Sequence, residues 1–209
     1  MHDRCDQLPL IPPMVHPQRD LDDVGAVVRE GLVSKSSTVR VGRWVERAAD
    51  DVDIVVTVGG ISAGDRDFFP GILDAMDAKT RIAGAAIQPG KPVRIQRLPS
   101  GVMIVSLPGN PVSVLATACL FLWPLIRTML GCTSPMPWRP VELASDVHAN
   151  AGRELFRPAS VQPAGSVVVP VWQGSGDLSH AASTDGLVAI PRRTGPVSTG
   201  TTVRFLPWP

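Results

Sequence analysis

Residues 102–113 read VMIVSLPGNPVS, and this segment predicts a strand, a rigid turn and a helix in direct succession. The apolar, β-branched run is typical of a strand that is buried on both faces. Pro111 can begin a helix without losing a needed hydrogen-bond donor, and Asn110 is suited to the N-cap position before it. We therefore expect a helix over residues 111–130, ended by Gly131.

The segments around this unit repeat the same pattern. DIVVTV is a second β-branched run, and the glycine turn GGISAG follows it directly. The expected strands cover residues 53–58, 82–87, 92–97 and 102–107, and the expected helices cover residues 38–49 and 68–78, with Pro70 in the first turn of the latter. Strands that alternate with helices predict a three-layer α/β domain with a mostly parallel sheet over residues 1–133.

The sequence changes character after about residue 134. Three prolines mark a linker, and the runs beyond it are short, β-branched and separated by turn residues: VELASDV, SVVVPVW, GLVAIP and TTVRFL. Such runs predict a small antiparallel all-β unit, and we expect a β-barrel domain over residues 137–209.

Composition excludes several classes of protein. Of the 209 residues, 44% are hydrophobic and 19% charged, and the net charge of +1 argues against a nucleic-acid partner. Three cysteines without ligand spacing argue against a disulfide framework or a zinc site and fit a reducing, cytoplasmic compartment. The longest apolar run, Val112 to Ile126, is shorter than the roughly 20 residues of a membrane span, so we expect a buried helix and no membrane. The first residues lack the apolar core of a signal peptide.

Three turns follow or flank the expected strands: GGISAG, QPGK and LPGNP. In an open α/β sheet, ligands bind at the carboxyl ends of the strands, and backbone N–H groups freed by glycine can bind an anion there. Each turn alone also has a plain structural interpretation, a tight turn with a helix cap or a solvated Lys91. The spacing does not match the phosphate-binding loop of nucleoside triphosphatases. Because three such turns occur in one α/β unit, a shared site explains them better.

Together, GGISAGDRDF, PGKP, LPGNPVS and QGSGDLSHAASTDGLVAIP resemble the molybdopterin molybdenumtransferases, to which the E domain of gephyrin is related. The resemblance is dense over residues 52–133 and looser to the end of the chain. It implies a molybdopterin-binding α/β domain of the MogA type followed by the C-terminal β-barrel. It also implies insertion of molybdate into adenylylated molybdopterin during molybdenum cofactor biosynthesis, assisted by Mg²⁺, and a dimer.

The resemblance also implies roles for particular residues. Asp67 would be the catalytic, metal-binding carboxylate. The implied substrate-binding residues are Gly59, Gly60, Ser62, Gly64, Lys91, Pro108, Gly109, Asn110, Pro111, Ser113 and Ser175.

The chain also departs from the family pattern. Ser36 and Ser37 stand where the family has an acidic pair, and Gly84 and Gln88 stand where it usually has basic residues. The family's large N-terminal domains are not in this sequence, so a homodimer, or a separate chain that supplies those domains, is an implied partner. Two alternatives to the transferase therefore stay open: a non-catalytic molybdopterin-binding or carrier protein, and a scaffold that keeps only the fold.

Overall fold

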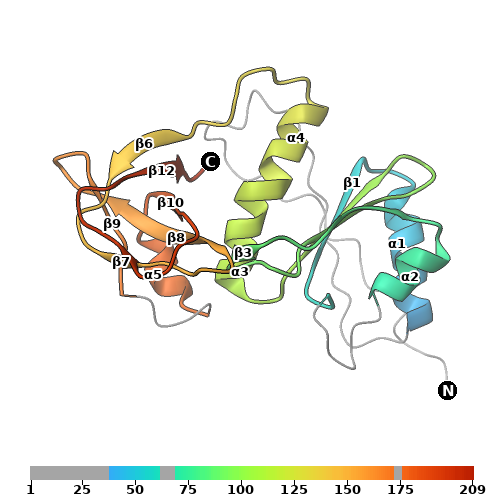
Figure 1. Cartoon of the computed structure of the whole chain (residues 1–209). Coiled ribbons are helices and arrows are strands. Elements are labelled where there is room, and N and C mark those ends of the chain that lie inside the picture. The colour runs from blue at the N-terminus through green and yellow to red at the C-terminus, as the bar shows by residue number, and fades with distance from the viewer. Residues whose placement is uncertain (1–37, 62–68, 172–175) are drawn as a thin grey trace.

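The computed structural model describes residues 38–61, 69–171 and 176–209, which form two main sheets with a long helical run between them (Figure 1). The first sheet has the strand order β1-β5-β4-β2, and the second follows the path β3-β8-β10-β12-β6. As the sequence predicts, the first part of the chain forms an α/β unit and the second part forms a β unit.

The first sheet contains β1 (Ile54–Val58), β2 (Lys79–Ala83), β4 (Arg94–Arg97) and β5 (Met103–Leu107). Only β1 and β5 pair in parallel, whereas β4 pairs antiparallel with both β5 and β2. The expectation of a mostly parallel sheet is therefore wrong for the described strands, which form a mixed sheet.

The reason for the antiparallel pairing lies in the connections. Parallel neighbours need a crossover of a dozen or more residues, usually a helix. β4 and β5 are joined instead by a tight turn, in which Gly101 donates its N–H to the carbonyl of Leu98. The expected strand over residues 82–87 is divided in the structure: β2 ends at Ala83, and the short β3 (Ile87–Gln88) pairs with the second sheet.

Helices cover both faces of the first sheet. α1 (Thr38–Ala49) and α2 (Phe69–Ala75) pack on one face, where Val45 and Leu73 are fully buried beside Ile104. On the opposite face, Val105 and other strand residues meet the helical run, which comprises α3 (Pro111–Thr117), the wider π-helical turn η2 (Ala118–Leu122) and α4 (Trp123–Met129).

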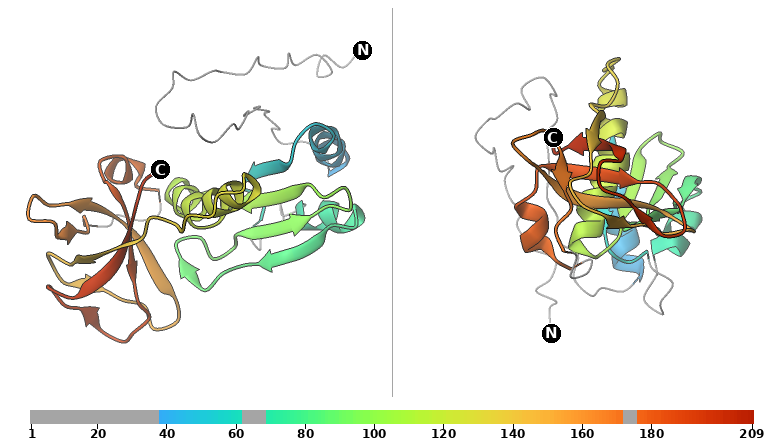
Figure 2. Two further views of the ribbon diagram at one scale, coloured as in Figure 1. Left: turned by 90° about the horizontal axis from the view of Figure 1, so that it is seen from above. Right: turned by 60° about the vertical axis from the view of Figure 1, so that its left-hand side comes forward.

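The helical run contacts both sheets, which explains why it is apolar nearly all round. Val114 and Leu125 pack against the first sheet, whereas Ala116 and Cys119 pack against strands of the second. Figure 2 shows the run between the two sheets. The run Pro111–Met129 is long and apolar enough to cross a membrane by length and composition, a test that core helices of soluble proteins also pass. It ends as predicted, with Gly131 at a φ of +75°.

The second sheet contains β3, β8 (Glu154–Val161), β10 (Gly186–Ile190), β12 (Thr202–Pro207) and β6 (Arg139–Glu142), with β9 (Val167–Val168) paired to β8. β7 (Val147–His148) and β11 (Pro196–Val197) form a separate two-stranded ladder. Within the described ranges the strands form no closed barrel, which corrects that prediction. The sheet curls, but the side of β6 reaches β9 only through a single bridge between Leu143 and Val167. Two-residue strands such as β9 are too short to complete a ladder.

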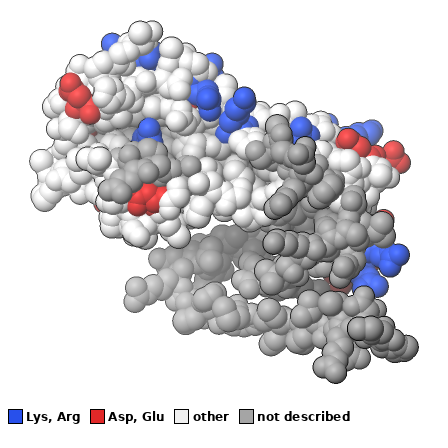
Figure 3. All heavy atoms as spheres, turned by 90° about the horizontal axis from the view of Figure 1, so that it is seen from below, with Lys and Arg blue, Asp and Glu red and all other residues white. Residues whose placement is uncertain are grey.

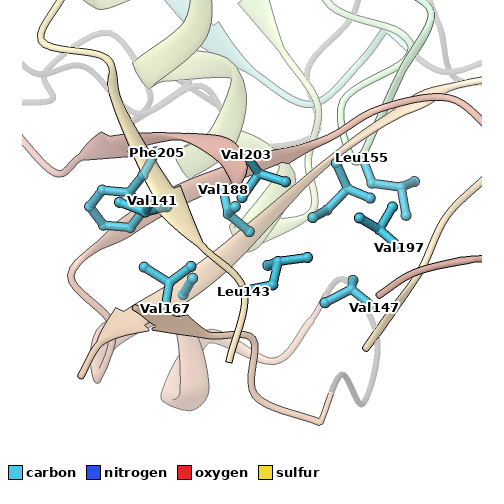
Figure 4. Packing of buried hydrophobic residues seen from close by; sticks show 11 residues of the cluster. Val141, Leu143, Val147, Leu155, Val167, Val188, Val197, Val203 and Phe205 are labelled. Carbon is cyan, nitrogen blue, oxygen red and sulfur yellow. The ribbon is translucent and has the colours of Figure 1, made fainter. Parts of the chain in front are cut away.

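The core of this second unit lies inside the curled sheet. Figure 4 shows Phe205, Val188 and Val167 among the side chains that meet there from different strands. Gly186 permits the close pairing of β10 and β12, since a Cβ at that position would overlap the Leu206 carbonyl. The helix α5 (Leu178–Ala182) was not expected from the sequence, because five residues are too few to show a helical period.

Candidate functional site

The glycine turn after β1 lies against the LPGNP turn after β5. Their strands end side by side, with Val58 opposite Leu107. Gly59 and Gly60 have φ values of +83° and +71°, and a Cβ on Gly109 would be 3.4 Å from the Gly59 Cα. We call the surface formed by Gly59, Gly60, Pro108, Gly109 and Asn110 the glycine edge. The two turns thus meet at the carboxyl ends of two parallel strands, as predicted.

Asn110 carries the most informative atom of the glycine edge. It occupies the N-cap position of α3, as expected, but its side chain makes no capping hydrogen bond. Its Oδ1 atom is buried and has no hydrogen-bond partner among the residues that the structure describes. Because a buried acceptor without a partner costs about 1–3 kcal/mol, such an atom suggests a group that is completed by a ligand donor.

The backbone N–H groups of the two glycines differ in availability. Gly59 donates its N–H to the Leu107 carbonyl at 2.9 Å, so this donor is already used within the protein. Gly60 is exposed, and its N–H has no backbone hydrogen bond to another described residue. Of these two glycines, both predicted to contact phosphate, only Gly60 therefore offers an N–H to an anion.

A pair of hydroxyl groups lies one residue before the ends of the two strands. Thr57 donates its hydroxyl to Ser106 Oγ at 3.1 Å, and Ser106 is 1% exposed. This contact ties β1 to β5 next to the glycine edge. The sequence interpretation missed these residues, although a hydroxyl residue at the same place in two apolar strands was a visible signal.

The QPGK turn lies at the same end of the sheet but packs elsewhere. It precedes β4, whose first residue Arg94 pairs with Ser106. Gly90 fits against Thr117 of α3, where a Cβ would overlap the Thr117 methyl group. The Lys91 side chain is exposed. The structure therefore brings this turn to the predicted end of the sheet, on the side that faces the second unit.

The remaining predicted site residues differ in how the structure treats them. Pro111 is the exposed first residue of α3, and Ser113 is 6% exposed on its buried side. Ser62, Gly64, Asp67 and Ser175 lie outside the described residues. The catalytic and metal-binding role of Asp67 stays a prediction.

The described residues contain no metal-binding cluster of their own. Within residues 38–61, 69–171 and 176–209, no group of three His, Cys, Asp or Glu side chains could hold a metal ion. The described residues therefore do not test a Mg²⁺ site that depends on Asp67. On the described part of the face in Figure 3, Lys and Arg lie among Asp and Glu side chains and form no continuous stripe.

The chain matches two family models in the order that the fold suggests. Residues 18–128 match the probable molybdopterin binding domain, and residues 140–208 match the MoeA C-terminal region, domain IV. The chain therefore belongs to the molybdopterin-binding domain family, joined to a C-terminal region of the MoeA type.

Similar whole proteins carry related names. Molybdopterin molybdenumtransferase 2 of Mycobacterium tuberculosis is 32% identical over 186 residues, covering 86% of this chain and 46% of that protein. A molybdopterin molybdenumtransferase of Nostoc sp. is 30% identical over 189 residues, covering 86% of this chain and 43% of that protein. The chain thus spans less than half the length of these relatives.

A solved structure supports the same arrangement. The molybdopterin biosynthesis MoeA protein from Pyrococcus horikosii aligns with a TM-score of 0.68 and 27% sequence identity, over 81% of this chain and 40% of that protein.

Proposed function

We propose that this chain acts in molybdenum cofactor biosynthesis by binding adenylylated molybdopterin at the glycine edge, where molybdate is inserted into it. The single observation that carries this proposal is the buried Oδ1 of Asn110, which lacks a partner among the described residues and lies in a turn packed on the glycine turn. The family membership and the names of the relatives support the class of ligand.

The chemistry of the glycine edge fits such a ligand. A pterin carries N–H donors, and Asn110 Oδ1 is an acceptor that no described residue satisfies, so we propose that the two form a hydrogen bond. The exposed N–H of Gly60 is suited to a phosphate oxygen, because backbone donors in a glycine turn bind anions. Lys91 supplies a cation near the same end of the sheet for another phosphate oxygen.

We further propose that the two parts of the chain have the different roles that the sequence predicts. Residues 1–133 would bind the ligand, and residues 137–209 would form the second unit, with Ser175 reaching toward the site. Asp67 would supply the carboxylate for the reaction, and Mg²⁺, if bound there, would neutralise phosphate charge. The partner would be a second copy of this chain or a separate chain that supplies the domains present in the longer relatives, in the cytoplasm.

The first experiment tests the binding role of Asn110. Asn110→Leu removes the acceptor at nearly the same size, so we expect molybdopterin to bind about tenfold or more weakly, the loss of one buried hydrogen bond. The melting temperature should not fall, since the side chain neither caps α3 nor places its Oδ1 in a hydrogen bond with another described residue. Equal affinity of Asn110→Leu and the unchanged chain, measured by fluorescence titration, would refute the proposed contact.

The second experiment tests turnover. The purified chain, alone and with a longer relative's N-terminal domains, is given adenylylated molybdopterin, molybdate and Mg²⁺, and release of AMP is followed. Asp67→Asn should abolish release while leaving molybdopterin binding largely intact. Binding without AMP release in both mixtures would instead make the chain a carrier or binding module. Absence of binding would leave only a scaffold role.

A further inference from the structure

A second cluster of charged side chains lies at the opposite end of the first sheet from the glycine edge. A hollow of about 360 Å³ is lined by Asp77, Lys79, Arg81, Arg97, Leu98 and Pro99. Arg97 pairs with Met103, the first residue of β5, whereas the glycine edge follows the last residue of that strand. The two places are therefore separate, and we call the first the basic hollow.

Two cations of the basic hollow face each other across neighbouring strands. Lys79 of β2 is directly opposite Arg97 of β4. Side chains in such a position have Cβ atoms about 4.5–5.5 Å apart, and like charges there are destabilising. Neither side chain forms an ion pair with a described residue, and both are exposed to solvent. No ion pair within the described residues therefore offsets their mutual repulsion.

A bulge adds a third cation. The register of β2 against β4 shifts between Thr80 and Ile82, so Arg81 is the extra residue of the edge strand. Bulges re-aim side chains, and here Arg81 lines the same hollow as Lys79 and Arg97.

The side of the basic hollow formed by the β4–β5 hairpin is well fixed. Arg97 donates its Nε–H to the Gly101 carbonyl at 3.4 Å, which holds the guanidinium along the turn. The guanidinium lies close to Gly101, because a Cβ there would be in ordinary contact with Arg97 Nη2 at 3.5 Å. Pro99 and the hydrogen bond from Gly101 to Leu98 stiffen the turn that forms the wall.

One carboxylate lines the basic hollow and is also held in place. Asp77 follows α2 in a left-handed conformation with a φ of 54°. Its N–H bonds to the Asp74 carbonyl, and the next N–H, of Ala78, bonds to the Leu73 carbonyl, the pattern of a Schellman cap. Three cations and one carboxylate line the hollow, so its formal charge is three minus one, or +2.

We propose that the basic hollow binds a tetrahedral oxyanion that carries two negative charges, of the class that includes phosphate, sulfate and molybdate. The formal charge of +2 in the basic hollow balances the two negative charges of such an anion. The Arg97 and Arg81 guanidinium groups can each donate two hydrogen bonds to adjacent oxygens, and Lys79 adds a point charge. This site is independent of the glycine edge and of the reaction proposed there.

The test titrates the full chain with inorganic phosphate at constant ionic strength and follows backbone amide NMR signals. We expect shifts at Lys79, Arg81 and Gly101. Shifts confined to Gly59, Gly60 and Gly109 would place phosphate at the glycine edge alone and overturn the proposal, as would the absence of any shift. Sulfate and molybdate should compete with phosphate for the same signals, whereas nitrate, which is planar and carries one charge, should not.

Charge variants have opposite expected effects. Lys79→Gln and Arg97→Gln should each weaken phosphate binding about tenfold, the loss of one charge-assisted hydrogen bond. Asp77→Asn should strengthen it, because a repelling carboxylate is removed. Arg193→Gln, which removes an exposed cation after β10, is the matched control and should leave affinity unchanged. Equal weakening by Arg193→Gln, or weakening by Asp77→Asn, would overturn the proposal.

A thermal unfolding measurement checks that these variants remain folded. Without phosphate, Lys79→Gln should melt at the same temperature as the unchanged chain or higher, since one like-charge contact is relieved. With saturating phosphate the order should reverse, because a ligand raises the melting temperature of the form that binds it. A lower melting temperature of Lys79→Gln without phosphate would contradict the argument from repulsion.

Discussion

Gly59 donates its backbone N–H to the carbonyl of Leu107 at 2.9 Å, and this bond joins the two turns that form the glycine edge. It uses a donor that a phosphate would otherwise bind. It also fixes the distance between the turns. The position of Asn110 therefore depends on the conformation of Gly59, which lies 51 residues earlier in the chain (110 minus 59).

Two glycine substitutions should distinguish the cost of a positive φ from the cost of steric overlap at the glycine edge. Gly59→Ala puts a side chain on a residue with a φ of +83°, so we expect the free energy of unfolding to fall by about 1 kcal/mol or more. Gly109 does not have a positive φ, and its Cβ would be in ordinary contact with Gly59, so Gly109→Ala should be nearly neutral for stability. Urea unfolding of both variants checks this, and equal losses would contradict it.

Gly90→Ala should be more damaging, because both conformation and space oppose it. Its φ is +108°, and the new Cβ would overlap the Thr117 methyl group. Overpacking of this kind costs about 1–3 kcal/mol. Thr117→Ser removes the methyl group but keeps the hydroxyl that bonds to the Ser113 carbonyl. In the double variant we expect part of the loss to be recovered; strictly additive losses in thermal unfolding would show that the methyl group is not the obstacle.

The two described cysteines should differ sharply in reactivity. Burial raises the pKa of the Cys119 thiol to about 11, whereas Cys132 is exposed. A thiol reagent attacks the thiolate, so at about pH 8 it should modify Cys132 quickly and Cys119 only when the chain unfolds. Mass spectrometry of a Cys5→Ser variant, with and without denaturant, measures both sites. Rapid modification of Cys119 in the folded chain would be inconsistent with its burial on the side of the helical run that packs against the second sheet.

Asp146 should make stability depend on acid pH. The Thr199 backbone N–H at 2.8 Å, and then its hydroxyl at 3.0 Å, lower the pKa of this carboxyl below its ordinary value of 3.8. A lowered pKa in the folded state gives stability that is present above the ordinary value and is lost as pH falls through the folded pKa.

Asp146→Asn should therefore unfold at lower urea concentration than the unchanged chain at neutral pH, and this difference should shrink below pH 3.8. Glu142→Gln, at an exposed carboxyl of β6, is the control and should show no such convergence. A difference between Asp146→Asn and the unchanged chain that stays constant with pH would argue against the hydrogen bonds to Thr199 as its source.

Local patterns predicted several elements well. α1 has the expected bounds, since Val45 and Ala48 mark one buried helical face, and the helical run begins at Pro111 and ends before Gly131 as the turn chemistry indicates. The meeting of the glycine turn and LPGNP could also be predicted, because both follow strands that end at one edge of a sheet.

Other features depend on contacts between distant residues. Residues 82–87 read as one strand, but Ile87 packs under the helical run and pairs with Glu154, so the segment is shared between two sheets. The antiparallel direction of β4 follows from a short turn and from which strand it pairs with, and an apolar strand pattern does not reveal that direction.

The sequence by itself determined the turns and the helix ends, because glycine, proline and asparagine act on their own backbone. Only the tertiary structure decided that Gly59 donates its N–H to Leu107, that Asn110 Oδ1 is buried without a partner among the described residues, and that Lys79 faces Arg97. These are facts about which strands lie side by side, and strand pairing is fixed by the packing of the whole chain.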